Sequence, residues 1–521
     1  MLRNNLLRAF SISLLGSYTN CSHKKKNFPD NIISKVETIP ENIYHEKKIA
    51  LIIRQKGTNS ISKEPEYSQD EVSLKNGLDG NRCWVTYRDG VYDISDYLNK
   101  HPGGKSFIMK AAGGSVDDFW EYWGVHHYSA DVSGQLEKRR IGRFSDYDYS
   151  QNKIENNMYL NEEERHPNLK KYINQPFEAE SCYQELASKE FTDPSLFFVR
   201  NHAPVPYVEK SDKHQIIFLD ELGTHKCVQT VDELISKFGI KEVPSVLQCS
   251  GNRAREIIQN NKLSKMAGKP SEKVGYGLMG NSKWSGIPLE SVLYHVYPEL
   301  VNMRMSEIEK KHLVLHGSDD YVSSVPLQKI LGDSQRKNNC LLATQMDGKP
   351  LNLDHGFPVR ALFPGIVGAR SVKWLSKIEI SNQESQSPWN KYFYKNGNKP
   401  CMEIPLNSLI TFAKVKKSTL FIKGVAYSDG ELINKVEISL DKGQHWSKVN
   451  ITNQPKSLYS WVRWEYQAPT HNLFKNEQEC VEIMCRATSN NRKQNKLNGS
   501  LNQIESDGYL YDGWHQIKVH K

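Results

Sequence analysis

The chain of 521 residues contains no apolar run that approaches the roughly 20 residues needed to cross a bilayer as a helix. Stable membrane insertion is therefore not expected. Its nine cysteines stand at irregular spacings without a CxxC pair, which predicts mostly free thiols and argues against a disulfide framework. The charge bias is weak, with 69 Lys and Arg against 60 Asp and Glu, as on ordinary solvated surfaces. Nucleic-acid binding is therefore not expected.

The first 26 residues contain no acidic side chain but include five basic ones. Leu2, Leu6 and Phe10 recur at helical spacing, so one face of a helix here would be apolar and another basic. This composition predicts a mitochondrial transit peptide over residues 1–26, with a disordered basic terminus as the alternative. A secretory signal fits less well, because Arg8 and several serines interrupt the apolar stretch.

The rest of the chain is too long for one core and divides into segments of different character. Residues 27–65 show no periodicity and are expected to be a spacer, and residues 66–144 form a compact unit. A polar, acidic stretch at 145–164 predicts a flexible hinge. A long mixed stretch covers 165–400, and short alternating strands occupy 401–521.

The first compact unit has the features of a haem site. Strand-like runs at 83–87 and 91–94 lead to His101, which is followed by Pro-Gly-Gly, and helical spacing continues over 107–120. Glycines let the backbone pass close to a flat ligand, and His126 supplies a second candidate for the iron.

The pattern HPGG…AAGG…FW…VH resembles a cytochrome b5 domain, in the form found in the sulfite oxidase family. The resemblance implies a b-type haem held by two histidines, with His101 and His126 as ligands to the iron. His127, next to His126, is the alternative; the family's Val-His pair falls at Val125-His126.

A second site is indicated by Cys249 in Leu-Gln-Cys-Ser-Gly-Asn-Arg, together with Arg200-Asn201-His202 upstream and Asp354-His355 downstream. One cysteine alone is most often a core thiol. Cationic and amide-rich loops together with one soft thiolate, however, suit a large anionic cofactor that carries a phosphate.

These segments resemble the molybdopterin domain of the sulfite oxidase family, which eukaryotic nitrate reductase shares. The resemblance implies that Cys249 binds molybdenum, that Arg200 orients the substrate and that Tyr394 assists at the active site. The positions that match the family's pterin contacts are Phe198, Val199, Arg200, Asn201, His202, Asp319, His355, Arg360, Ser371, Val372 and Lys373.

The fold class predicted is a multidomain α+β protein. It comprises a small α+β cytochrome b5-like domain, a mixed α/β molybdopterin domain and a C-terminal immunoglobulin-like β-sandwich. The sandwich rests on alternating strands at 420–424, 435–440 and 460–464, and the polar stretch 486–500 is expected to be a loop. Residues 401–521 resemble the family's dimerisation domain, which implies a homodimer.

The resemblance implies oxidation of sulfite to sulfate, with electrons passing through the haem to cytochrome c in the mitochondrial intermembrane space. Oxygen is the alternative acceptor. Assimilatory nitrate reductase is not expected, because it places its b5 domain after the molybdenum domain and adds a flavin module.

The substrate pocket departs from the family's pattern. A pocket arginine five residues after the cysteine is replaced by Ala254, and Asp507 stands in place of another near Trp514-His515. Phe393 replaces an aspartate, and Val274 and Tyr276 occupy the segment where a pocket tryptophan is expected. A dianion needs positive charge around it. Two alternatives therefore stay open: oxidation or reduction of another oxyanion or an S- or N-oxide, and a cofactor-binding protein that has lost turnover.

Overall fold

The computed structural model describes residues 64–520, except for 102–104, 123–125, 127–129, 148–161, 175, 209–212, 262–272, 392, 397, 472, 475–479 and 497–508. The predicted transit peptide, the spacer up to residue 63, His127 and Asp507 lie outside the described residues, as does most of the predicted hinge. The described helices include none that is long and apolar enough to cross a membrane.

The first domain is built on a four-stranded sheet in the order β1-β4-β3-β2. Its strands are β1 (Glu66–Tyr67), β2 (Trp84–Tyr87), β3 (Gly90–Asp93) and β4 (Arg140–Phe144), and its helices are α2 (Gln69–Ser73), α3 (Lys105–Ile108), η1 (Met109–Ala111), α4 (Asp117–Tyr122) and α5 (Ala130–Glu137). Val85 and Tyr92 are paired across the β2–β3 hairpin and are buried in the apolar core of the domain, and Val91 is buried on the opposite face. The helical stretch expected over 107–120 is interrupted after η1, because Gly113 (φ +75°) turns the chain between η1 and α4.

The central domain contains two five-stranded sheets, a small three-stranded one and the two-stranded pair β18-β19. The first has the order β10-β11-β14-β15 with β16 paired to β14, the second β13-β12-β17-β8-β9 and the third β5-β6-β7. The strands are β5 (Lys170–Ile173), β6 (Glu178–Glu180), β7 (Val199–Arg200), β8 (Gln215–Leu219), β9 (His225–Thr230), β10 (Lys241–Gln248), β11 (Met279–Pro288), β12 (His312–Gly317), β13 (Val322–Pro326), β14 (Leu341–Met346), β15 (Lys349–Pro350), β16 (Arg360–Leu362), β17 (Leu375–Ser381), β18 (Lys395–Asn396) and β19 (Lys399–Pro400).

Helices and tight turns connect these sheets around one large apolar core that includes Phe218, Leu293 and Leu342. The α-helices are α6 (Tyr183–Leu186), α7 (Val231–Phe238), α8 (Ala254–Asn261), α9 (Leu289–Val296), α10 (Met305–Ile308), α11 (Ser334–Lys337) and α12 (Pro388–Lys391). Between them lie η3 (Pro194–Leu196), η7 (Pro298–Val301), η8 (Gln328–Gly332), η9 (Leu353–His355) and η10 (Gly368–Arg370).

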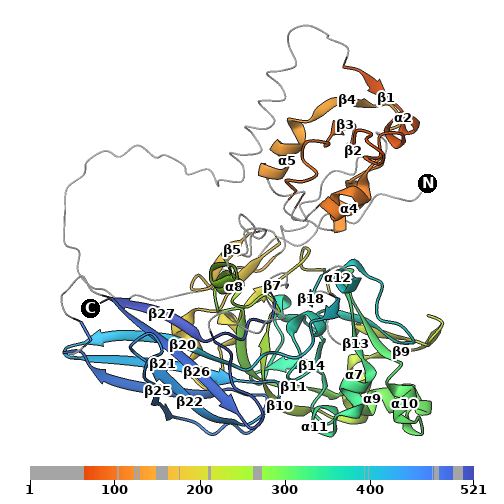
Figure 1. The fold of residues 1–521 in the computed structure, drawn as a ribbon. Helices are drawn as coiled ribbons and strands as arrows, with labels where there is room; N and C mark the ends of the chain where they lie inside the picture. Colours follow the sequence, from red (N-terminus) through yellow and green to blue (C-terminus); the bar gives the residue numbers. More distant parts are fainter. Residues whose placement is uncertain are drawn as a thin grey trace, which may run out of the picture. The chain divides into compact units, whose positions relative to one another are not determined.

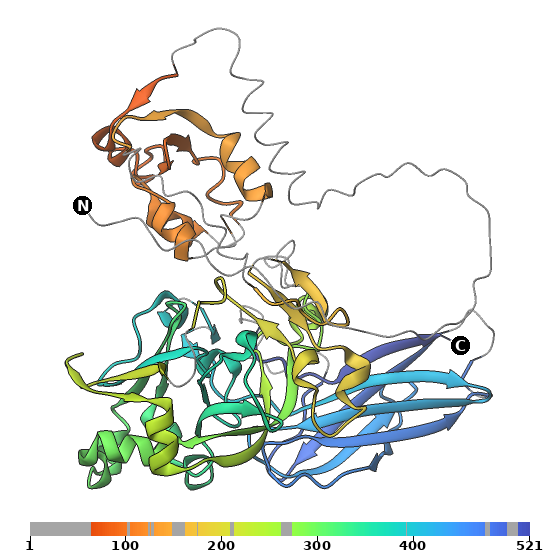
Figure 2. The same ribbon diagram turned by 180° about the vertical axis from the view of Figure 1, so that it is seen from behind.

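The C-terminal domain is a sandwich of two four-stranded antiparallel sheets, β20-β21-β25-β24 and β23-β22-β26-β27 (Figures 1 and 2). The strands are β20 (Asn407–Lys416), β21 (Thr419–Tyr427), β22 (Ile433–Ser439), β23 (Ser447–Lys448), β24 (Asn450–Ile451), β25 (Val462–Pro469), β26 (Cys480–Ser489) and β27 (His515–His520). Inward side chains such as Ile422, Trp464 and Ile483 fill its core. The predicted fold class is confirmed, but residues 486–489 continue β26 instead of starting a loop.

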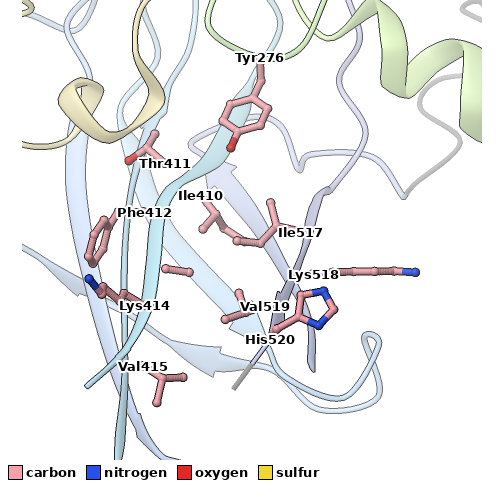
Figure 3. A pocket seen from close by; sticks show the side chains of 11 residues that line it. Tyr276, Ile410, Thr411, Phe412, Lys414, Val415, Ile517, Lys518, Val519 and His520 are labelled. Atoms are coloured by element: carbon pink, nitrogen blue, oxygen red, sulfur yellow. The ribbon is translucent and has the colours of Figure 1, made fainter. Parts of the chain in front are cut away.

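The open edge of this sandwich carries a groove of about 410 Å³ along β20 and β27, which are the edge strands of the two sheets. Figure 3 shows Ile410, Phe412 and Val415 of one strand and Ile517 and Val519 of the other along its walls. Lys414, Lys518 and His520 also line it, so apolar and basic side chains are mixed along the groove.

Candidate active site

The small sheet β5-β6-β7 carries three polar side chains toward the region around Cys249. Tyr172 stands at a register shift between Lys171 and Ile173, and such a bulge re-aims the side chain that it contains. Glu178 and Arg200 are direct partners across the antiparallel pair β6–β7. Their side chains form an ion pair in which the glutamate is buried and the arginine side chain is 31% exposed.

Cys249 follows the last residue of β10 and is buried. Its amide donates to the Leu278 carbonyl over 2.9 Å, which fixes the residue beside β11. Burial raises the pKa of the thiol, and the charge of Arg200 acts against that rise. A cation that favours the thiolate is what a cysteine ligand to a metal requires.

Arg200 stays protonated at this site. Burial alone would lower the pKa of its guanidinium, but the nearby groups of Tyr394, Tyr172 and Cys249 outweigh it, and the pKa is raised. The charge of Arg200 also affects the pKa of Cys249 and that of Tyr394, so the three side chains lie near one another. The structure therefore brings the three predicted catalytic residues into one site.

His202 and Tyr394 form the next side of the site, with 2.5 Å between His202 Nε2 and the tyrosine hydroxyl. Burial lowers the pKa of His202 well below its usual value, helped by Arg200 and Lys373, so the ring is neutral. Burial raises the pKa of the Tyr394 hydroxyl, which therefore keeps its proton. The Tyr509 ring lies 5.7 Å from that of Tyr394.

Lys373 ties several of the predicted pterin-contacting residues together. Its ammonium donates to the side chain of Asn201, to the Asp354 carbonyl over 2.9 Å and to the Arg200 carbonyl over 3.3 Å. The Asp354 carboxylate is held in turn by Arg165 through two bonds of 2.8 Å. Burial lowers the pKa of Lys373 to about 7.

The other predicted contacts surround the same region. Arg360 donates to the His355 carbonyl over 3.1 Å and to the Ser371 carbonyl over 2.9 Å, and His355 Nε2 bonds to the Pro194 carbonyl over 3.0 Å. Burial raises the pKa of Asp319 to about 6, although Lys373 opposes that shift. Phe198, Val199 and Val372 are buried apolar side chains at the same loops.

Arg360 provides a test of whether an anionic cofactor fits here. The residue is only 4% exposed, its Nε has no hydrogen-bond partner among the described residues, and burial lowers its pKa to about 9. A buried guanidinium without a carboxylate is unfavourable unless an anion completes it. The phosphate of a molybdopterin would supply that anion, so the residues fit the cofactor.

The first domain offers a comparable test for haem. The rings of His101 and His126 are nearly parallel, with 17° between their planes and 6.2 Å between their centres. Two imidazole–metal bonds of about 2 Å each, in line, give a separation of this size once the distances from nitrogen to ring centre are added. An iron ion therefore fits between the two rings, and Trp120 packs 5.6 Å from His126.

The structure shows what surrounds Ala254, which stands where the family's pattern has a pocket arginine. Ala254 is buried beside Cys249, in the same apolar cluster as Phe198. Neighbouring Arg253 does not replace the missing arginine, because its guanidinium donates to Glu256, Asn407 and two carbonyls of the C-terminal segment. Arg255 bonds to the Lys273 carbonyl.

Three residues of the site were not predicted from the sequence: Tyr172, Glu178 and Tyr509. Glu178 and Glu180 alternate along a strand, which is a visible pattern, but the partner of Glu178 depends on strand register. Tyr509 reaches the site because the Leu510 amide donates to the Ser250 carbonyl over 2.9 Å, a contact between distant parts of the chain.

Comparison with family models assigns three regions. Residues 68–145 match the cytochrome b5-like haem/steroid-binding domain, residues 202–389 the oxidoreductase molybdopterin-binding domain, and residues 399–521 the Mo-co oxidoreductase dimerisation domain. With the buried cysteine, the facing histidines and the buried Arg360, whose Nε has no partner among the described residues, these matches define a molybdenum- and haem-dependent oxidoreductase with a dimerisation domain.

Comparison with related proteins identifies the family within this class of oxidoreductases. The chain is 32% identical over 483 residues to a sulfite oxidase of Gallus gallus, covering 87% of this chain and 99% of that protein. It is 31% identical over 483 residues to a mitochondrial sulfite oxidase of Rattus norvegicus, covering 87% and 84%. The chain belongs to the sulfite oxidase family. The crystal structure of the sulfane dehydrogenase SoxCD from Paracoccus pantotrophus shares the fold, with a TM-score of 0.54 at 20% identity over 70% of this chain and 87% of that one.

Proposed function

We propose that this oxidoreductase converts sulfite to sulfate and passes the electrons through its haem to cytochrome c. The observation that carries the proposal is the convergence of Cys249, Arg200 and Tyr394 at one buried site, each at a position where the family's pattern places a catalytic residue. The similarity to proteins named sulfite oxidase over most of the chain supports the same substrate.

In the proposed reaction, sulfite and water give sulfate, two protons and two electrons. Molybdenum, when bound, supplies oxygen transfer and takes up the electron pair. Arg200 holds the anion beside Cys249 and stays charged while doing so, because neighbouring groups raise its pKa. The neutral Tyr394 hydroxyl, held by His202, can donate a hydrogen bond to an oxygen of the substrate.

His101 and His126 would hold a b-type haem, which with two histidine ligands supplies one-electron transfer. The two electrons of each turnover would therefore leave in two one-electron steps. We infer that cytochrome c is the acceptor, with oxygen as the other possibility, and that the protein acts as a homodimer in the mitochondrial intermembrane space. The basic, acid-free residues 1–26 support import as a transit peptide.

The deciding experiment mixes the oxidised, cofactor-replete protein with sulfite anaerobically and follows the haem absorption. Rapid reduction is expected, and Cys249→Ser is expected to abolish it while leaving the haem bound. Cys227→Ser is the matched control, since that thiol lies on β9 and is not among the predicted ligands. A molybdenum-replete protein whose haem stays oxidised in sulfite would refute the proposal.

A second candidate is oxidation or reduction of another oxyanion or of an S- or N-oxide. It is favoured by Ala254, which leaves the site with fewer cations than a dianion calls for. Such an enzyme would show a molybdenum-linked spectral change with its own substrate and none with sulfite. A protein that has lost turnover would respond to neither.

A further inference from the structure

The ion pair between Glu178 and Arg200 bears directly on the substrate. Arg200 is the predicted anion-orienting residue, and its charge is already balanced by a buried carboxylate directly opposite on β6. An incoming anion must share Arg200 with Glu178 or displace it. A carboxylate so near opposes a dianion more strongly than a monoanion, because the repulsion scales with the charge of the ligand.

The other described cations near the site do not replace the positive charge that Glu178 neutralises on Arg200. Lys373 donates to three oxygen acceptors and lies near the carboxylates of Asp319 and Asp354. Arg253 is fully used in binding Glu256, Asn407 and the C-terminal segment. Arg360 belongs to the group of predicted pterin contacts.

Neutral donors are present instead. The Tyr172 hydroxyl is buried and has no hydrogen-bond partner among the described residues. It lies close enough to Arg200, Cys249 and Glu180 to be affected by each of them. Tyr394 contributes a second protonated hydroxyl. Hydroxyls bind the oxygens of a weakly charged ligand without needing a full negative charge in return.

We propose that Glu178 is a specificity-determining residue that matches the site to a singly charged sulfur oxyanion. This inference rests on the proposed function and narrows its substrate to hydrogensulfite or to an organic sulfinate, which share one negative charge and an oxidisable sulfur. Hydrogensulfite and water give sulfate, three protons and two electrons. A sulfinate and water give a sulfonate, two protons and two electrons. In both cases the electrons leave through the haem.

The test measures binding of unreactive anions to the holoenzyme by titration calorimetry. The probes are sulfate, a dianion, and methanesulfonate, a monoanion of similar shape. The wild type is expected to prefer methanesulfonate. Glu178→Gln is expected to strengthen sulfate binding by about tenfold, since it frees Arg200 and removes the opposing charge. Glu178→Asp retains the charge and is the matched control, expected to keep the wild-type preference.

Two results would overturn the inference. The first is a wild type that prefers sulfate. The second is a folded Glu178→Gln protein that binds sulfate no better or more weakly, as it would if Glu178 only held Arg200 in place. A parallel experiment follows haem reduction by hydrogensulfite and by methanesulfinate. Reduction by either one supports the inference and shows which of the two substrates the site accepts. If neither donor reduces the haem while the calorimetry behaves as expected, the proposed function fails and the charge preference stands.

Discussion

Tyr394 connects two parts of the active site, because its hydroxyl meets His202 and its ring faces Tyr509. Tyr394→Phe keeps the ring and removes the donor. We expect kcat/KM for sulfite to fall by about 10- to 100-fold, the effect of one lost hydrogen bond to a reacting anion, with the urea midpoint changed little. Tyr321→Phe is the control, because the Tyr321 hydroxyl donates to the Ala369 carbonyl instead. Equal losses in both variants would contradict a direct role for Tyr394.

His126, not His127, is the predicted second ligand of the haem iron. Its ring faces that of His101 at a separation that accommodates a metal. His126→Ala is expected to abolish the low-spin six-coordinate haem spectrum, whereas His127→Ala should retain it. The visible absorption spectrum of the purified variants measures this, and the reverse outcome would move the ligand to the neighbouring histidine.

At the level of single residues, much of the candidate site can be predicted from the sequence. Cys249, Arg200 and His355 stand in contiguous motifs whose residue types already indicate a metal and an anion. Glu178 could not be assigned to Arg200 in the same way, because its partner depends on the pairing of β6 with β7. The sequence likewise does not show how Arg253, next to Ala254, is used, because its partners Asn407 and Gly513 lie far along the chain.

At the scale of single elements, the turn between η1 and α4 decides the shape of the haem domain. Gly113 adopts φ +75°, and a Cβ there would lie 2.9 Å from the Ser73 carbonyl oxygen. Gly113→Ala is expected to destabilise this domain by about 1–3 kcal/mol through strain at that turn. Thermal loss of the haem absorption band measures this.

The next residue provides the matched control. A Cβ at Gly114 would meet the Ala111 carbonyl at 3.8 Å, an ordinary contact, and its φ is not positive. Gly114→Ala should therefore leave the melting temperature within about 1–2 °C of the wild type. If the two variants behave alike, backbone strain at Gly113 is not the cause.

The sequence predicts whether a segment is a strand or a helix better than it predicts where that strand or helix ends. Alternation located β21, β22 and β25, but the strands run past the apolar residues that revealed them. Likewise β26 continues through the polar residues 486–489, because its pairing with β22 satisfies the backbone whatever the side chains. Helical spacing over 107–120 was correct locally, but periodicity alone does not show that Gly113 interrupts it.

For the molecule as a whole, buried histidines predict sensitivity to acid. Burial lowers the pKa of His355 to about 4 and that of His515 to about 4. The unfolded chain takes up these protons near pH 6.5, before the folded one does. Stability is therefore fully present above pH 6.5 and is lost as the pH falls toward 4, by about 2 kcal/mol for each histidine between pH 7 and 5.

Urea unfolding at pH 7 and pH 5 measures this loss. His515→Asn keeps an acceptor for the Ile410 amide, which donates to His515 Nδ1 over 2.9 Å, and should make the pH dependence shallower. His445→Asn is the control, since that side chain is 89% exposed. An unchanged pH dependence in His515→Asn would contradict the prediction.

Arg253 makes the loop around the cysteine depend on a segment that the ribosome produces much later. The loop that presents Cys249 is held by the carbonyls of Gly513 and Trp514 and by the Leu510 amide, and Gly513 follows Arg253 by 260 residues. The cysteine loop therefore has its full support only once the chain has been synthesised through Trp514. Insertion of the molybdenum cofactor belongs after that point, and a stop codon before Gly513 would leave the loop unsupported.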